Sequence, residues 1–165
     1  MSSILSTLGL RAAGGSPAPS HAAAFLVGNW VFAHMATNSR WEKMRLGIDN
    51  NVAPREDLAT IGEAAVKEGK ISRSTLNRLK RKDATSTNLI DGFPFLVASI
   101  LFATVAGVPN ETINTIGVWY SVSRIAYAVS YIYGETQAMG SIRSLAWLSA
   151  NISCITGLVL ASKRL

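Results

Sequence analysis

The sequence of 165 residues is poor in cysteine and histidine, with one Cys, Cys154, and two His. A single cysteine excludes a disulfide within the chain, and no Cys/His cluster suggests a metal site. Charge is also scarce: charged residues make up 16% of the chain, whereas hydrophobic residues make up 48%. A typical soluble domain carries about 25% charged residues. The balance therefore favours a membrane protein with one polar insertion.

Long uninterrupted apolar runs are also missing. A helix that crosses a bilayer needs about 20 mostly apolar residues. Four segments meet this length, each with small and a few polar residues: 21–37, 87–108, 113–133 and 142–161. Helices that pack against one another in a membrane have this composition. The sequence predicts an all-α fold class, as an integral membrane four-helix bundle.

The N-terminal residues lack an apolar core. Residues 1–20 contain no acid and one arginine, so they resemble a signal or transit peptide only weakly. The glycines and prolines of 14–20 predict a hinge before the first helix. We therefore expect a flexible tail over 1–20 and one membrane domain over 21–165.

Positive charge is concentrated between the first two apolar segments. Residues 39–85 hold eleven of the sixteen lysines and arginines, whereas 106–114 hold none. Because such charge favours the cytoplasmic side, the loop 39–85 is predicted to be cytoplasmic and both termini lumenal. We expect a surface helix over 63–82 that runs into the second span, with its basic end on anionic lipid. The loop lacks interleaved aromatics, which argues against a nucleic-acid partner.

Polar residues recur inside the apolar segments. Asn88 and Asp91 are three residues apart and should share a helix face. Arg124, Tyr127 and Tyr131 follow the i, i+3, i+7 spacing of one stripe. An arginine at the centre of a bilayer helix costs about 2.5–3.5 kcal/mol. A residue this costly indicates a functional role.

The predicted topology brings these side chains to one level near the cytoplasmic side, together with Arg143. They would surround a basic, aromatic-walled cavity suited to an anionic ligand. Three simpler interpretations remain open. Asn88 and Asp91 would cap the second helix, Arg124 and Asp91 would form a structural ion pair, or Arg143 would anchor the chain on a phospholipid head group.

Four short motifs appear in a fixed order along the chain: "APRED" at 53–57, "TNLIDGFPFLVASILF" at 87–102, "SRIAYAVSYIYG" at 123–134 and "SIRS" at 141–144. With four spans and a basic loop, they resemble the MAPEG superfamily over roughly residues 20–160. These are membrane-associated proteins in eicosanoid and glutathione metabolism.

The resemblance implies a homotrimer with glutathione bound between neighbouring subunits, facing the cytoplasm. It implies that Arg143 stabilises the glutathione thiolate and is the catalytic residue. It also implies residues that hold the tripeptide: Arg45, Asn88, Asp91, Arg124, Tyr127, Tyr131 and Ser144. Ala84 and Thr87 depart from the family pattern, which has basic residues there, and the nearby Arg81 and Lys82 are possible substitutes.

The polar patterns and the resemblance together suggest three functions. The favoured one is a glutathione-dependent transferase, isomerase or peroxidase acting on a lipophilic substrate from the bilayer. The second is a non-catalytic lipid-binding or scaffold subunit. The third is an enzyme of the same fold that acts on a hydrophobic metabolite without glutathione, using Arg124, Asp91 and the tyrosines as acid–base groups. The expected location is the endoplasmic reticulum, with the mitochondrial outer membrane as the alternative.

Overall fold

The computed structural model describes residues 4–12 and 16–165, and their regular structure is helical. The predicted all-α fold class is therefore confirmed for these residues. The elements are α1 (Ile4–Thr7), α2 (Ala22–Val31), the π-helix η1 (Phe32–Ala36), α3 (Arg40–Arg45), α4 (Ile61–Lys67), α5 (Arg73–Val105), α6 (Asn110–Tyr133) and α7 (Gln137–Ser162).

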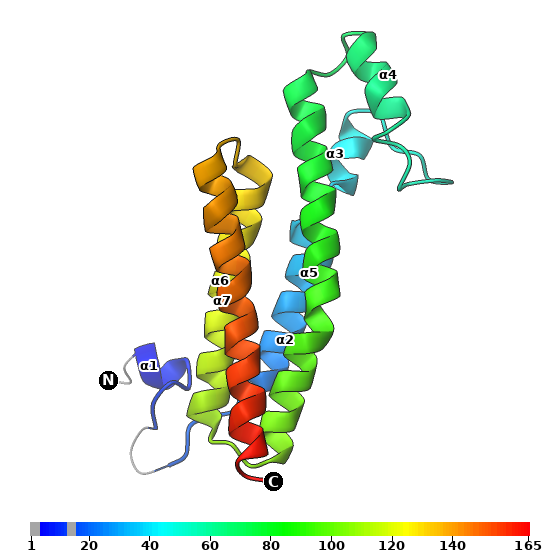
Figure 1. Ribbon diagram of the computed structural model, residues 1–165. Helices are drawn as coiled ribbons and strands as arrows, with labels where there is room; N and C mark the ends of the chain where they lie inside the picture. Colours follow the sequence, from blue (N-terminus) through cyan, green and yellow to red (C-terminus); the bar gives the residue numbers. More distant parts are fainter. Residues whose placement is uncertain (1–3, 13–15) are drawn as a thin grey trace.

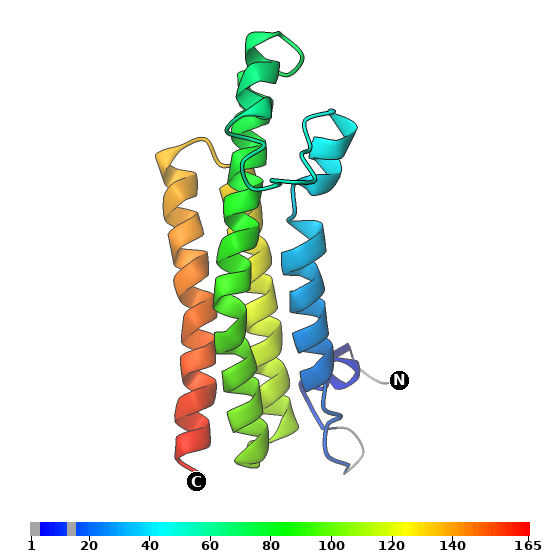
Figure 2. The ribbon, with the colours of Figure 1, turned by 90° about the vertical axis from the view of Figure 1, so that its right-hand side faces the viewer.

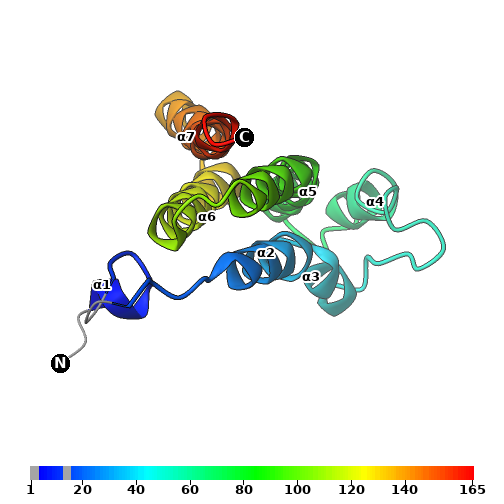
Figure 3. The same ribbon diagram turned by 90° about the horizontal axis from the view of Figure 1, so that it is seen from below.

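The long helices lie side by side. Helices α5 and α6 form the middle of the molecule, with α7 on one side and α2 on the other (Figure 3). Helix α1 and the C-terminus lie toward the end opposite α3 and α4 (Figure 1). At the α4 end, α5 extends beyond α6 and α7 and contacts α4 (Figure 2). The predicted membrane topology stays a prediction.

Helix α5 begins at Arg73, inside the segment 63–82 that was expected to form one helix with the second span. Gly69 has a φ of +73°, a conformation that favours glycine, and it follows α4. The hydroxyl of Ser72 then caps α5 by accepting the Thr75 amide at 3.1 Å. The expected single helix over 63–82 is therefore wrong. The capping role of Asn88 and Asp91 is also wrong, because both lie well inside α5.

Two of the four predicted spans fall in helices that are long and apolar enough to cross a membrane. By length and composition these are α5 and α7. Only 28% of the most apolar window of each is buried inside the chain, so most of this surface faces outward. Helix α6 covers the third predicted span, and α2 with η1 covers the first. Crossing by these two elements stays a prediction.

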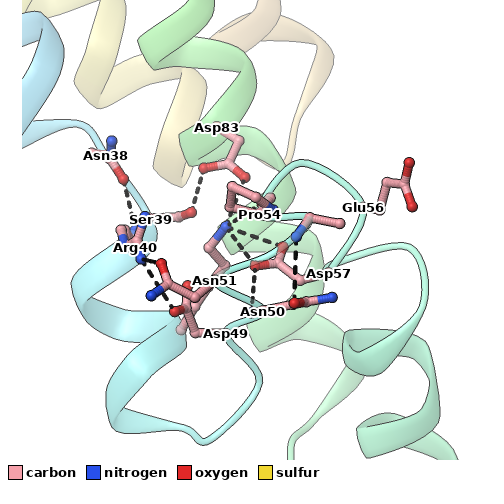
Figure 4. A network of polar contacts seen from close by, with 12 residues as sticks. Asn38, Ser39, Arg40, Asp49, Asn50, Asn51, Pro54, Glu56, Asp57 and Asp83 are labelled. Carbon is pink, nitrogen blue, oxygen red and sulfur yellow. Dashed lines mark hydrogen bonds and ion pairs between the residues drawn. The ribbon is translucent and has the colours of Figure 1, made fainter.

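The connection between η1 and α5 is held by a buried ion pair (Figure 4). Lys43 is 4% exposed and Asp57 is fully buried, and the Lys43 Nζ lies 3.0 Å from Asp57 Oδ2. The same ammonium donates to the carbonyl of Pro54 at 3.0 Å. Ser39 donates to Asp83 on α5. These contacts fix the loop internally and against the first third of α5.

A second tie joins α3 to α5 through Glu42. Its carboxylate lies 2.6 Å from Lys82 Nζ and 2.9 Å from the Arg78 guanidinium. Partial burial would raise the pKa of Glu42, but these two cations outweigh it and hold the pKa below its usual value. Beneath this surface, Ile48, Leu76 and Leu79 form a small apolar core. The loop is therefore a folded unit with its own interior.

The described part of the N-terminal segment is attached to α6. The Asn114 amide donates to the carbonyls of Gly9 at 2.9 Å and Pro19 at 2.8 Å, and Asn110 donates to Ala18 at 2.8 Å. The flexible tail expected over 1–20 is thus bound to the helical body by backbone acceptors. Residues 1–3 and 13–15 of that tail lie outside the described residues.

Candidate functional site

A cavity of about 490 Å³ opens where α5, α6 and α7 meet. We call it the site cavity. Its lining comprises Asn88, Tyr127, Tyr131, Arg143, Ser144, Trp147 and Leu148. Five of these are predicted site residues, which the fold brings together from three helices. Trp147 and Leu148 add an apolar wall that faces outward from α7.

Arg143 is held in this cavity by an aromatic ring. Its guanidinium carbon lies 4.5 Å from the centroid of the Tyr131 ring. Tyr131 in turn packs edge-on against Tyr127, with centroids 5.6 Å apart. Among residues 4–12 and 16–165, Arg143 has no hydrogen bond or ion pair. The cation is oriented by stacking, while its N–H donors stay free for an anion.

Arg124 lies behind the wall of the site cavity. It is 1% exposed, and its guanidinium carbon is 5.0 Å from the Tyr120 ring and 5.8 Å from the Tyr127 ring. Its Nη1 donates to Asn88 Oδ1 at 3.4 Å, and its Nε has no partner. Arg124 therefore supports Asn88 and Tyr127, both of which line the cavity.

The alternative of an Arg124–Asp91 ion pair is not what the structure contains. Asp91 is exposed, and it forms no ion pair in the part of the chain that is described. Arg124, on α6, packs against Gly92 and Asn88 of α5. Asp91 points to another side of α5, where it lines a cavity that Arg124 does not border.

Gly92 is the residue that admits the Arg124 side chain between α5 and α6. A Cβ built on Gly92 would overlap the guanidinium of Arg124. We expect Gly92→Ala to lower the stability of the protein in detergent by roughly 1–3 kcal/mol, through overpacking. Thermal unfolding would measure this. Gly28→Ala is the matched control, because nothing lies within 4 Å of the Cβ built there.

Arg124→Met should compensate, since methionine lacks the planar guanidinium that overlaps the new methyl group. The double variant Gly92→Ala/Arg124→Met is expected to be more stable than the sum of the two single changes predicts. Equal unfolding temperatures for Gly92→Ala and Gly28→Ala would instead mean that Arg124 leaves its place without cost.

A second cavity of about 640 Å³ lies between α5 and the 39–72 connection, and we call it the loop cavity. Asp91, Thr87 and Ala84 line it from α5, and Arg40 and Arg55 line it from the connection. Asn88 and Asp91 therefore border different cavities, although their spacing predicted a shared face.

The remaining predicted residues lie elsewhere. Arg45 is exposed at the end of α3 and lines neither cavity. Lys82 is engaged by Glu42, and Arg81 donates to the carbonyl of Ile132 at 3.0 Å. Neither side chain takes the place of the basic residues that the family pattern has at positions 84 and 87.

Sequence reasoning missed Arg40 and Arg55 as lining residues. Arg55 was visible in "APRED", where it departs from the family's loop motif, but nothing in the sequence placed it opposite Ala84 and Thr87. In the loop cavity these two arginines lie in the same lining as Ala84 and Thr87, and Arg40 is also paired with Asp49 at 3.6 Å.

The comparisons with known proteins give one match. The sequence model of the MAPEG family matches residues 20–162, which is most of the chain. No curated protein and no solved structure matches.

Proposed function

The chain belongs to the MAPEG family, and from this premise we propose that it is a membrane-embedded, glutathione-dependent enzyme acting on a lipophilic substrate. The family consists of membrane proteins of eicosanoid and glutathione metabolism. The reaction we propose is a transfer, isomerisation or peroxide reduction, in which the sulfur of glutathione reacts. The proposed location is the endoplasmic reticulum.

The observation that carries the proposal is Arg143, a cation that forms no ion pair among the described residues and lines a cavity of about 490 Å³. A thiol reacts as its thiolate, and a nearby cation lowers its pKa. Arg143 would hold the thiolate at the level of Tyr131, with Asn88 and Ser144 binding the peptide. Trp147 and Leu148 would meet the apolar substrate arriving from the bilayer.

The distribution of the other predicted residues supports a site shared between copies. Asn88 borders the site cavity and Asp91 borders the loop cavity, on a different side of α5. Within one chain the two residues therefore face different cavities. A homotrimer, in which the loop cavity of one copy adjoins the site cavity of the next, would join the two sets. The four-helix membrane bundle, with α2–η1 and α6 also crossing, is the protomer we propose.

Glutathione binding to the purified protein in neutral detergent tests this function. We expect saturable heat by calorimetry and a raised unfolding temperature, and we expect native mass spectrometry to find trimers that carry glutathione. S-methyl glutathione is the matched ligand control, since it keeps the peptide and removes the ionisable thiol. No glutathione binding by a correctly assembled trimer would contradict the proposal.

One observation favours the second candidate, a non-catalytic lipid-binding subunit. Ala84 and Thr87 are exposed in the loop cavity at positions where the family pattern is basic. Without basic residues at these two positions, the binding of glutathione carboxylates would be weaker, unless Arg40 and Arg55 supply the missing charge. Trimers that retain lipid through purification but do not bind glutathione would select this candidate.

A further inference from the structure

A third cavity lies beside the site cavity, where α6 ends and α7 begins. It measures about 600 Å³, and we call it the turn cavity. It shares Tyr131 and Arg143 with the site cavity, so the Arg143 side chain borders both. Helix α5 closes it with Arg81, and the α6–α7 turn, beside α5 in Figure 1, contributes Glu135.

Arg81 is fixed in position while part of its guanidinium remains free. Its Nε donates to the backbone carbonyl of Ile132 at 3.0 Å, and its Nη2 lies 3.2 Å from Glu135 Oε1. Its Nη1 has no partner in the described part of the chain. A guanidinium anchored through Nε to a backbone carbonyl keeps its orientation when the carboxylate leaves.

Glu135 is the weakly held member of this pair. Its side chain is 69% exposed, whereas that of Arg81 is 25% exposed. Exposed ion pairs are weak because water and salt screen them. The carboxylate is therefore a counter-ion that a stronger anion can replace.

The start of α7 adds to the positive potential of the turn cavity. Thr136 caps this helix by accepting the Met139 amide at 3.3 Å, and Thr136 and Gln137 both line the cavity. The N-terminus of a helix carries partial positive charge that favours anions. The single carboxylate of Glu135 is therefore opposed by two arginines and this helix end, and Arg143 has no ion pair in the part of the chain that the structure describes.

We propose that the turn cavity binds a phosphate group, with Arg81 and Arg143 as its donors and Glu135 displaced. Two arginines and a helix N-terminus suit the several oxygens of a phosphate, which accept charge-assisted hydrogen bonds in more than one direction. The phosphate comes either from a free phosphate compound or from a lipid head group, because Arg81 lies in the basic stretch 78–82 expected at the membrane surface. The site goes beyond the proposed glutathione function, which assigns no role to Arg81 or Glu135.

The first test titrates inorganic phosphate into the protein in neutral detergent, against chloride at equal ionic strength, and follows the unfolding temperature. Arg81→Gln should weaken phosphate binding roughly ten- to hundredfold, since it removes a charged donor. Glu135→Gln should strengthen binding several-fold, because it removes the competing carboxylate. Glu68→Gln is the matched control: it makes the same charge change in an exposed pair with Lys70, at 2.8 Å, and should leave binding unchanged.

The second test separates the two sources of phosphate. The protein is placed in nanodiscs of phosphatidylcholine with or without phosphatidic acid, and native mass spectrometry identifies the retained lipid. Retention of phosphatidic acid that falls in Arg81→Gln and rises in Glu135→Gln assigns the site to a lipid head group. Phosphate binding in detergent with no preference for phosphatidic acid assigns it to a free phosphate compound.

The proposal is overturned if neither probe binds, or if Glu135→Gln behaves like Glu68→Gln. Glu135→Gln keeps the test decisive even where Arg81→Gln misfolds, because Glu135 is exposed and its loss leaves no buried group unpaired. Glutathione calorimetry on the same samples distinguishes the two proposals. Glutathione binding without phosphate binding would remove the phosphate site alone.

Discussion

Replacing Arg143 with alanine is expected to lower glutathione-dependent turnover roughly a hundred- to a thousandfold, the cost of removing one group that stabilises charge in a reaction. Binding of glutathione should weaken much less, because Asn88, Ser144 and the tyrosines remain. The physical reason is the position of the cation: it stacks on Tyr131 at 4.5 Å and has no ion pair within the described ranges 4–12 and 16–165, so it is free to face a thiolate. Turnover with a generic electrophile and calorimetry separate the two effects.

The thiol itself provides a second readout of this role. With Arg143 in place, the pKa of the bound glutathione thiol should lie below that of free glutathione, as followed by the ultraviolet absorbance of the thiolate across pH. In Arg143→Ala it should return toward the free value. Lys163→Ala, at the exposed far end of α7, is the charge-matched control. Normal turnover and an unchanged thiol pKa in Arg143→Ala would remove the thiolate role from Arg143.

Replacing Asp57 with leucine is expected to destabilise the loop by about 3–5 kcal/mol, the cost of leaving a buried charge without its partner. Lys43 is 4% exposed and would keep only the Pro54 carbonyl and a more distant contact with Asp83, at 3.8 Å. Hydrogen exchange over 39–72 should rise well above its rate in the parent protein, while exchange in the interior of α6 and α7 should change little.

The double variant Lys43→Met/Asp57→Leu provides the internal check. Removing both charges eliminates the unpaired ion, so most of the lost protection should return. Glu68→Ala removes one member of an exposed pair with Lys70 and should have little effect. If Asp57→Leu is as mild as Glu68→Ala, the loop does not depend on this pair, and Arg40 and Arg55 are then held in the loop cavity by other contacts.

The sequence by itself determined the helical class, the family and five of the residues that line the site cavity. The apolar segments predict membrane helices because each is long enough to cross a bilayer. Their small and polar residues are typical of helices that pack against one another in a membrane. The stripe of Arg124, Tyr127 and Tyr131 follows from the 3.6-residue repeat of a helix. Since α6 and α7 are joined by a short turn, their facing ends had to meet, and Arg143 therefore lies over Tyr131 as expected.

Only the tertiary structure decided which side of α5 each polar residue serves. Residues three apart are neighbours on a helix, yet Asn88 and Asp91 border different cavities because α6 and α7 pack on one side of them and the loop on another. The helical repeat specifies the direction of each side chain around the helix axis, but it does not specify which other helix or loop packs on that side.

Packing between elements also decided where the side chains of Arg81 and Arg124 lie. Arg81 was a possible substitute for the basic residue missing at Ala84, but its Nε donates to the carbonyl of Ile132 at the end of α6. An ion pair between Arg124 and Asp91 was one of the open interpretations, but Arg124 fits against Gly92 because only glycine leaves space there. Both outcomes depend on close approaches between helices distant in sequence. Such approaches are set by packing, which local patterns do not encode.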